Sequence, residues 1–165
     1  MADYTQTKAI GQFDKNSCWA ACLSWWLKAV GDGRPALSQL NLIAEFDKYC
    51  DPDTGGLSPK AFKDVVSKDA RFKMSMSYFT ASKFVGAGLP IGDTPIIVIY
   101  NYPTIGGTHM NVVFEKRDGT VNCMEPYFPY PGKDGNRTGK FERRPTSHFL
   151  NSPEIGLAWA TVKFD

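Results

Sequence analysis

The chain has 165 residues and a formal charge of +2, and 42% of its residues are hydrophobic and 22% charged. This composition is that of an ordinary globular protein, which excludes a disordered tail and a coiled coil. The net charge is too small to give an argument for a nucleic-acid partner. The longest apolar run, residues 95–100, is strand-sized, so we expect no membrane span. The sequence has no internal repeat and no long linker, and we expect a single domain over residues 1–165.

Helices are predicted in the first part of the chain. Residues 18–30 are apolar on nearly every side, which is typical of a helix that is buried all round. Ser38 is suited to cap a second helix over residues 39–49. Pro59 is suited to the first position of a third helix, which would end near residue 69.

Strands are predicted in the rest of the chain. We expect a half-buried strand over residues 72–78 and a buried strand over residues 95–100. A hairpin that turns at Asp118-Gly119 is expected to join strands over residues 109–115 and 120–125. Two further strands are expected over residues 140–143 and 157–164. Helices followed by strands favour the α+β class, with an N-terminal helical layer packed on an antiparallel sheet.

The most informative segment runs from Gln12 to Trp19 and places Cys18 in the first turn of the predicted buried helix. The N-terminus of a helix carries partial positive charge, which favours the thiolate, the nucleophilic form of cysteine. Its N–H groups, with one side-chain amide nearby, can also hold an oxyanion. Gln12, six residues before Cys18, is suited to be that amide. The alternative interpretation is a buried core cysteine.

A nucleophilic thiol needs a base within hydrogen-bonding reach, and the chain has only two histidines. His109 begins an apolar strand after the pair Gly106-Gly107, and such glycines allow substrate or backbone to approach closely. His148 has no comparable setting and is interpreted as structural. His109 is therefore the candidate base.

A catalytic imidazole needs a partner on its second nitrogen. Glu125 lies across the predicted hairpin from His109 if the chain turns at Asp118-Gly119. Asn122 is an alternative partner, although strand alternation places it on the face opposite Glu125.

Together these segments resemble the papain-like cysteine peptidase superfamily. Gln12 followed by Ser-Cys-Trp at the head of an apolar helix carries the resemblance, and the order Cys18, His109, Glu125 agrees with it. The Glu125-Pro126 ending of the hairpin is similar to the Asp-Pro of bacteriocin-processing and related bacterial C39-type peptidases. The Ser-Cys-Trp-Ala-Ala segment also resembles small papain-fold effector proteases of plant- and animal-associated bacteria.

The resemblance implies a papain-like fold and hydrolysis of a peptide bond through a thioester, with neither metal nor cofactor. It implies that Cys18 is the nucleophile, His109 the general base and then acid, Glu125 the residue that orients the imidazole, and Gln12 the oxyanion donor. Papain has an asparagine where Glu125 stands, so this sequence departs from papain at the third position.

Two other functions remain open: a peptidoglycan amidase or endopeptidase of papain-like fold, and a papain-like domain that only binds. The expected partners are a protein or peptide substrate and a cognate immunity or inhibitor protein. The N-terminus lacks the apolar segment of a Sec signal peptide. Together with the resemblance to effector proteases, this absence suggests a bacterial effector or toxin that is secreted by another route or delivered into a target cell. The alternative location is the cytoplasm.

Several side chains outside these motifs also carry expectations. Trp25 and Trp26 are expected in the core, and Cys22 is expected to be a small core residue, although a disulfide with Cys50 remains open. The basic residues between 133 and 144 alternate with acidic ones and are interpreted as a solvated face; they are Lys133, Arg137, Lys140, Arg143 and Arg144.

Overall fold

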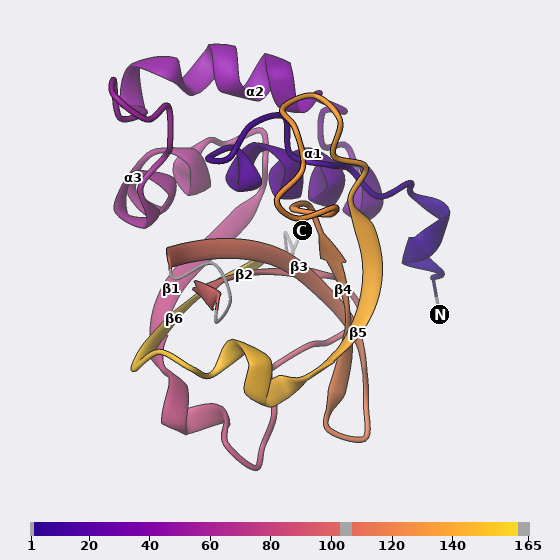
Figure 1. Ribbon diagram of the computed structural model, residues 1–165. Coiled ribbons are helices and arrows are strands. Elements are labelled where there is room, and N and C mark those ends of the chain that lie inside the picture. The colour runs from indigo at the N-terminus through magenta and orange to yellow at the C-terminus, as the bar shows by residue number, and fades with distance from the viewer. Residues whose placement is uncertain (1, 103–106, 162–165) are drawn as a thin grey trace.

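The computed structural model describes residues 2–102 and 107–161. The helices are α1 (Cys18–Val30), α2 (Gln39–Phe46) and α3 (Pro59–Asp64), and the strands are β1 (Met74–Thr80), β2 (Ile96–Tyr102), β3 (Gly107–Arg117), β4 (Thr120–Glu125), β5 (Lys140–Pro145) and β6 (Glu154–Ala160). The strands form one six-stranded sheet in the order β1-β6-β2-β3-β4-β5, and every neighbouring pair is antiparallel. The three helices lie together on one side of the strongly curved sheet (Figure 1).

Helix α1 is the centre of the helical layer and packs against β3, β2 and α2. Trp25 and Trp26 are fully buried, as predicted. Trp25 stacks on Phe114 of β3, with ring centroids 5.6 Å apart. Both indole N–H groups donate to backbone carbonyls, of Thr7 at 3.0 Å and of Pro95 at 2.9 Å, so the burial leaves neither N–H unpaired. Among the described residues, none of the helices combines the length and the apolarity that crossing a membrane requires.

The sheet separates two apolar clusters. Successive residues of a strand point to opposite faces, so Ile97 and Ile99 of β2 join the cluster beneath α1, whereas Val98 and Tyr100 join the cluster on the far side with Phe149. Burial on both faces explains why β2 has a continuous apolar sequence rather than an alternating one.

The hairpin prediction is confirmed. Asp118 and Gly119 both have positive φ, 50° and 74°, as a two-residue hairpin turn requires, and β3 and β4 pair on either side of them.

Some boundaries differ from the predictions. The first strand begins at Met74 rather than at residue 72 because Lys73 has φ of 47°, which a strand does not accommodate. Both later helices end early, and their last residues form the 3-10 turns Asp47–Tyr49 and Val66–Lys68. The last strand begins at Glu154 rather than at residue 157 and ends at Ala160, and residues 162–164 of the prediction lie outside the described residues.

The segment that carries Gln12 is held on one side by α2. The Gln39 side-chain amide donates to the Gly11 carbonyl at 2.7 Å and accepts from the Phe13 N–H at 2.9 Å. The Gln39 amide therefore forms hydrogen bonds with the backbone on both sides of Gln12, in the way that a neighbouring strand does.

On its other side the same segment lies against the loop over residues 126–139. The Gln12 N–H donates to the Pro126 carbonyl at 2.8 Å. A Cβ atom at Gly11 would overlap the backbone carbonyl of Arg137, so only glycine allows this approach.

We predict that Gly11→Ala lowers the free energy of unfolding by about 1–3 kcal/mol, because the added methyl group forces the two segments apart. Gly92→Ala is the control, since a Cβ there meets nothing within 4 Å. Urea denaturation of the two variants and the wild type would measure the difference. Equal stability of the two variants would show that the contact is not tight.

Candidate active site

Cys18 is the first residue of α1 and is half-buried. Ser17, which precedes it, makes no side-chain capping bond to the helix, and its hydroxyl oxygen instead accepts from the Asp14 N–H at 3.0 Å. The Ala20 N–H is already used, because it donates to the Ser17 carbonyl at 3.1 Å. The N–H groups of Cys18 and Trp19 are therefore the first-turn groups beside the thiol that can stabilise negative charge.

His109 connects Cys18 with Glu125. The imidazole is buried on β3, and its Nε2 lies 2.6 Å from Oε2 of Glu125. Burial alone would lower the pKa of His109, but hydrogen bonds to the side chains of Cys18 and Glu125, together with their negative charge, outweigh it and raise the pKa to about 9. With Nε2 on Glu125, Nδ1 is the ring nitrogen that can serve Cys18.

The register of the β3–β4 pair explains the contact between His109 and Glu125. Val112 of β3 pairs with Met124 of β4, so Glu125 falls one step further along and lies diagonal to His109 on the same face. Asn122, the alternative partner of the imidazole, pairs with Phe114 and donates to Glu115 at 2.9 Å, away from the histidine.

Both oxygens of the Glu125 carboxylate are hydrogen-bonded, as its burial requires, since the side chain is only 3% exposed. Oε2 accepts from His109, from Nδ2 of Asn111 at 3.0 Å and from the Tyr127 N–H at 3.2 Å. Oε1 accepts from Nη1 of Arg144 at 3.2 Å. Burial alone would raise the pKa of Glu125, but the hydrogen bond and charge of His109 and the charge of Arg144 keep it below its usual range.

The positions of Arg144 and Arg137 differ from the sequence-based prediction. The prediction of a solvated basic face is wrong for Arg144 and for Arg137, which are 7% and 6% exposed. Arg144 points into the sheet from β5, and besides Glu125 its guanidinium donates to Oδ1 of Asn111 at 2.7 Å and to Glu142 at 2.8 Å. The reason is strand alternation, which turns Arg143 to the solvent and Arg144 inward.

Asn111, Arg144 and Tyr100 support the candidate site, and the sequence analysis missed these roles. The Tyr100 hydroxyl donates to Oδ1 of Asn111 at 2.7 Å and lies 3.1 Å from Nε2 of His148. The only available signal was that Asn111 lies two residues after His109 and so shares its strand face.

His148 lies among the rings of Tyr100, Tyr102 and Phe149. Burial and the positive charge of Arg144 lower its pKa to about 4, so the ring is neutral near pH 7. This environment is consistent with the structural role expected for His148.

Gln12 is fully buried in the segment that leads into α1. Its Nε2 donates to the Asp14 carbonyl at 2.8 Å, and its Oε1 has no hydrogen-bond partner among the described residues. A side-chain amide has two N–H hydrogens, and the bond to Asp14 uses one of those of Gln12.

The remaining cysteines are not joined to one another. Cys22 and Cys50 are both free, so the disulfide left open by the sequence is not formed, and Cys22 is buried with its sulfur 3.5 Å from the Met110 carbonyl. Within residues 2–102 and 107–161, no group of three or more His, Cys, Asp or Glu residues is arranged to hold a metal ion.

Comparisons with known proteins identify the fold. No family model and no curated protein matches the chain. The peptidase domain of Streptococcus ComA, a bifunctional ABC transporter of a quorum-sensing pathway, matches with a TM-score of 0.58 and 14% identity over 94% of this chain and 99% of that domain. A double-glycine-motif protease from an AMS/PCAT transporter, solved with a leader peptide, matches with a TM-score of 0.54 and 17% identity over 95% of this chain and 96% of that one.

These similarities confirm the predicted fold class. The chain has the papain-like α+β fold of such C39-type peptidase domains, in which a helical layer with a buried central helix packs on an antiparallel sheet. Identities this low describe the architecture, so the roles of individual residues depend on the geometry above.

We predict that the two histidines titrate far apart, His109 near pH 9 and His148 near pH 4. Because the folded pKa of His109 lies above its unfolded value of about 6.5, its protonation stabilises the fold fully below pH 6.5, and this contribution is lost as the pH rises through 9. Carbon-13 NMR of the imidazole rings would measure both midpoints.

Cys18→Ala should lower the His109 midpoint, because it removes one of the interactions that raise it, whereas Cys50→Ala should leave it unchanged. A His109 midpoint at or below 6.5 in the wild type would contradict the described site.

We predict that Arg144→Met lowers the free energy of unfolding by about 1.5–3 kcal/mol at neutral pH, because it removes one of the two cationic partners of the buried Glu125 carboxylate together with its charge-assisted hydrogen bond. The matched control is Arg143→Met, which removes an exposed neighbour and should change stability by less than about 0.5 kcal/mol. Urea denaturation separates them, and similar losses for both arginines would refute a supporting role for Arg144.

Proposed function

We propose that the protein is a cysteine peptidase that hydrolyses a peptide bond through a thioester on Cys18. The observation that carries the proposal is the environment of His109. Its Nε2 lies on the buried carboxylate of Glu125, and interaction with the Cys18 side chain is among the causes that raise its pKa. A nucleophile, a base and a group that orients the base are the three parts that such a reaction requires.

The first half of the reaction forms the thioester. Near pH 7 His109 holds the proton of the Cys18 thiol, because its pKa of about 9 favours the imidazolium, and the sulfur attacks the carbonyl carbon of the substrate. The tetrahedral intermediate collapses when the C–N bond breaks, and the imidazolium of His109 gives its proton to the departing amine. Glu125 stabilises the imidazolium throughout, because its carboxylate stays ionised and fixed by its other partners.

The second half releases the acid. His109 takes a proton from water, the resulting hydroxide attacks the thioester carbonyl, and the C–S bond breaks to return the Cys18 thiol its proton. In both halves negative charge develops on the carbonyl oxygen. The first-turn N–H groups of α1 and the free hydrogen of the Gln12 amide are the donors suited to hold it.

The substrate class is proposed to be a peptide or an unfolded protein segment. A structurally similar protease was solved with a leader peptide bound, which supports this class. Delivery as a bacterial effector or toxin, and the existence of an immunity or inhibitor protein, stay predictions from the sequence resemblance.

We predict that Cys18→Ala abolishes both the cleavage of unfolded casein and covalent labelling by a peptide chloromethyl ketone, because it removes the attacking sulfur. Cys50→Ala is the matched control, since Cys50 is also free and half-buried, and it should retain both activities. Circular dichroism would verify that each variant is folded.

Two results would contradict the proposal. Cleavage that survives in Cys18→Ala would exclude the mechanism. Release of muropeptides from purified sacculi, without cleavage of casein, would favour a peptidoglycan amidase instead.

A further inference from the structure

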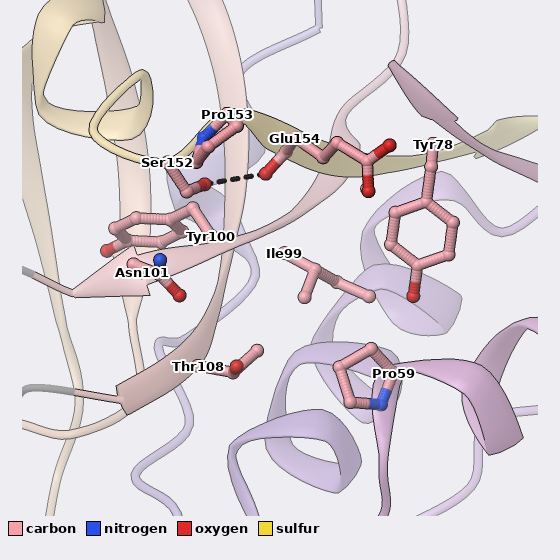
Figure 2. Close-up of a pocket in the computed structure, with 10 residues that line it drawn as sticks. Pro59, Tyr78, Ile99, Tyr100, Asn101, Thr108, Ser152, Pro153 and Glu154 are labelled. Atoms are coloured by element: carbon pink, nitrogen blue, oxygen red, sulfur yellow. Dashed lines mark hydrogen bonds between the residues drawn. The ribbon is translucent and has the colours of Figure 1, made fainter. Parts of the chain in front are cut away.

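Tyr102 is the last residue of β2 and packs against the candidate base. Tyr100 of the same strand pairs with His109 of β3. Two residues further on, Tyr102 pairs with Gly107 and therefore lies diagonal to His109 on the same face of the sheet. Figure 2 shows this end of the two strands, with Tyr100 on β2 and Thr108, which precedes His109, on β3. Because Gly107 has no side chain, the Tyr102 ring can lean across towards the imidazole.

The imidazole is in contact with three tyrosine rings, and Tyr102 is the nearest of them. The centroids of the Tyr102 and His109 rings are 5.1 Å apart, and their planes are nearly perpendicular, at 85°. The rings of Tyr100 and Tyr127 are each 6.1 Å from the imidazole and meet it in the same edge-to-face manner. The bond from Nε2 to Glu125 alone leaves the imidazole free to swing about that bond, so these rings decide its orientation.

The Tyr102 hydroxyl is linked to the same carboxylate through Arg144. The hydroxyl oxygen accepts from Nη2 of Arg144 at 3.2 Å, and Nη1 of Arg144 donates to Oε1 of Glu125 at 3.2 Å. The contacts therefore form a closed cycle that runs through His109, Glu125, Arg144 and Tyr102. The imidazole can turn away from the carboxylate only if the contact with Tyr102 breaks or the buried guanidinium moves.

An aromatic ring suits the charge state of the base. His109 is protonated near pH 7, and tyrosine rings attract a neighbouring cation. Tyr102 is half-buried, so water screens this attraction only in part. The other titratable groups around the imidazole come from five elements of the chain and are Cys18, Tyr100, Glu125, Tyr127 and His148, with Arg144 behind the carboxylate.

We infer that Tyr102 is a positioning residue of the proposed peptidase, whose ring holds the imidazolium of His109 in line with Glu125. The hydroxyl, bound by Arg144, keeps that ring in place. The inference rests on the proposed function, in which His109 carries the proton to the departing amine. Tyr102 is assigned no contact with the substrate, so its loss should slow the reaction without weakening substrate binding.

Carbon-13 NMR of the imidazole rings tests the contact without any turnover, in the wild type, Tyr102→Leu, Tyr102→Phe and the control Tyr4→Leu. Tyr4 is also half-buried, but it packs against Phe114. Tyr102→Leu should lower the His109 midpoint by about 0.5–1 pH unit, because it removes the nearest ring and leaves every other titratable neighbour in place. Tyr102→Phe keeps the ring and should retain most of the midpoint, and Tyr4→Leu should not change it.

Kinetics on a casein peptide with a mapped cleavage site separate positioning from binding. Tyr102→Leu should lower kcat about tenfold with KM unchanged, and Tyr102→Phe should recover most of the loss. A wild-type His109 midpoint and kcat in Tyr102→Leu, or equal losses in Tyr102→Leu and Tyr102→Phe, would overturn the inference and leave the peptidase function intact. A wild type that neither cuts casein nor labels at Cys18 would instead refute the proposed function, and the NMR comparison would still decide whether Tyr102 holds the imidazole.

Discussion

The buried carboxylate of Glu125 is the constraint on which the candidate site depends. A buried charge is costly unless it is paired and hydrogen-bonded, and this one is satisfied by His109 and Asn111 of β3, by Arg144 of β5 and by the Tyr127 N–H. The groups that fix the imidazole therefore also tie three neighbouring strands together. A change in any of them affects both the stability of the sheet and the orientation of the base.

The helical layer contributes the sulfur and the proposed oxyanion donor. Helix α1 is buried along most of its length against β2 and β3, so its first turn is fixed relative to His109 rather than free to shift. The extended segment that carries Gln12 has no such helix to hold it. It is fixed by the Gln39 amide on one side and by the 126–139 loop on the other, which places two independent supports around a single side chain.

Much of this arrangement follows from local sequence patterns. The all-apolar stretch predicted α1, and Asp118-Gly119 predicted the hairpin turn. The turn alone would pair Glu125 with Val112, on the face opposite His109. An irregularity between Phe114 and Arg117 shifts the register so that Val112 pairs with Met124, and this shift brings Glu125 onto the face of His109. The support of Glu125 by Arg144 could not be predicted in the same way, because Arg144 lies in a charged stretch whose alternation suggests solvent exposure. Only the pairing of β4 with β5 brings it beneath the carboxylate. Neither the bulge in the hairpin nor the long-range strand order leaves a signal in a single sequence.

The central claim is that sulfur and imidazole, which come from opposite layers of the fold, face each other across a short gap. Treatment with 1,3-dibromoacetone tests it most directly, because this reagent joins a thiol and an imidazole through a three-carbon bridge only when they are adjacent. Digestion and mass spectrometry should find the peptide containing Cys18 joined to the peptide containing His109, and no such product from Cys18→Ala. Attachment at Cys18 with the second end on His148, or with the second end left unreacted, would contradict the account.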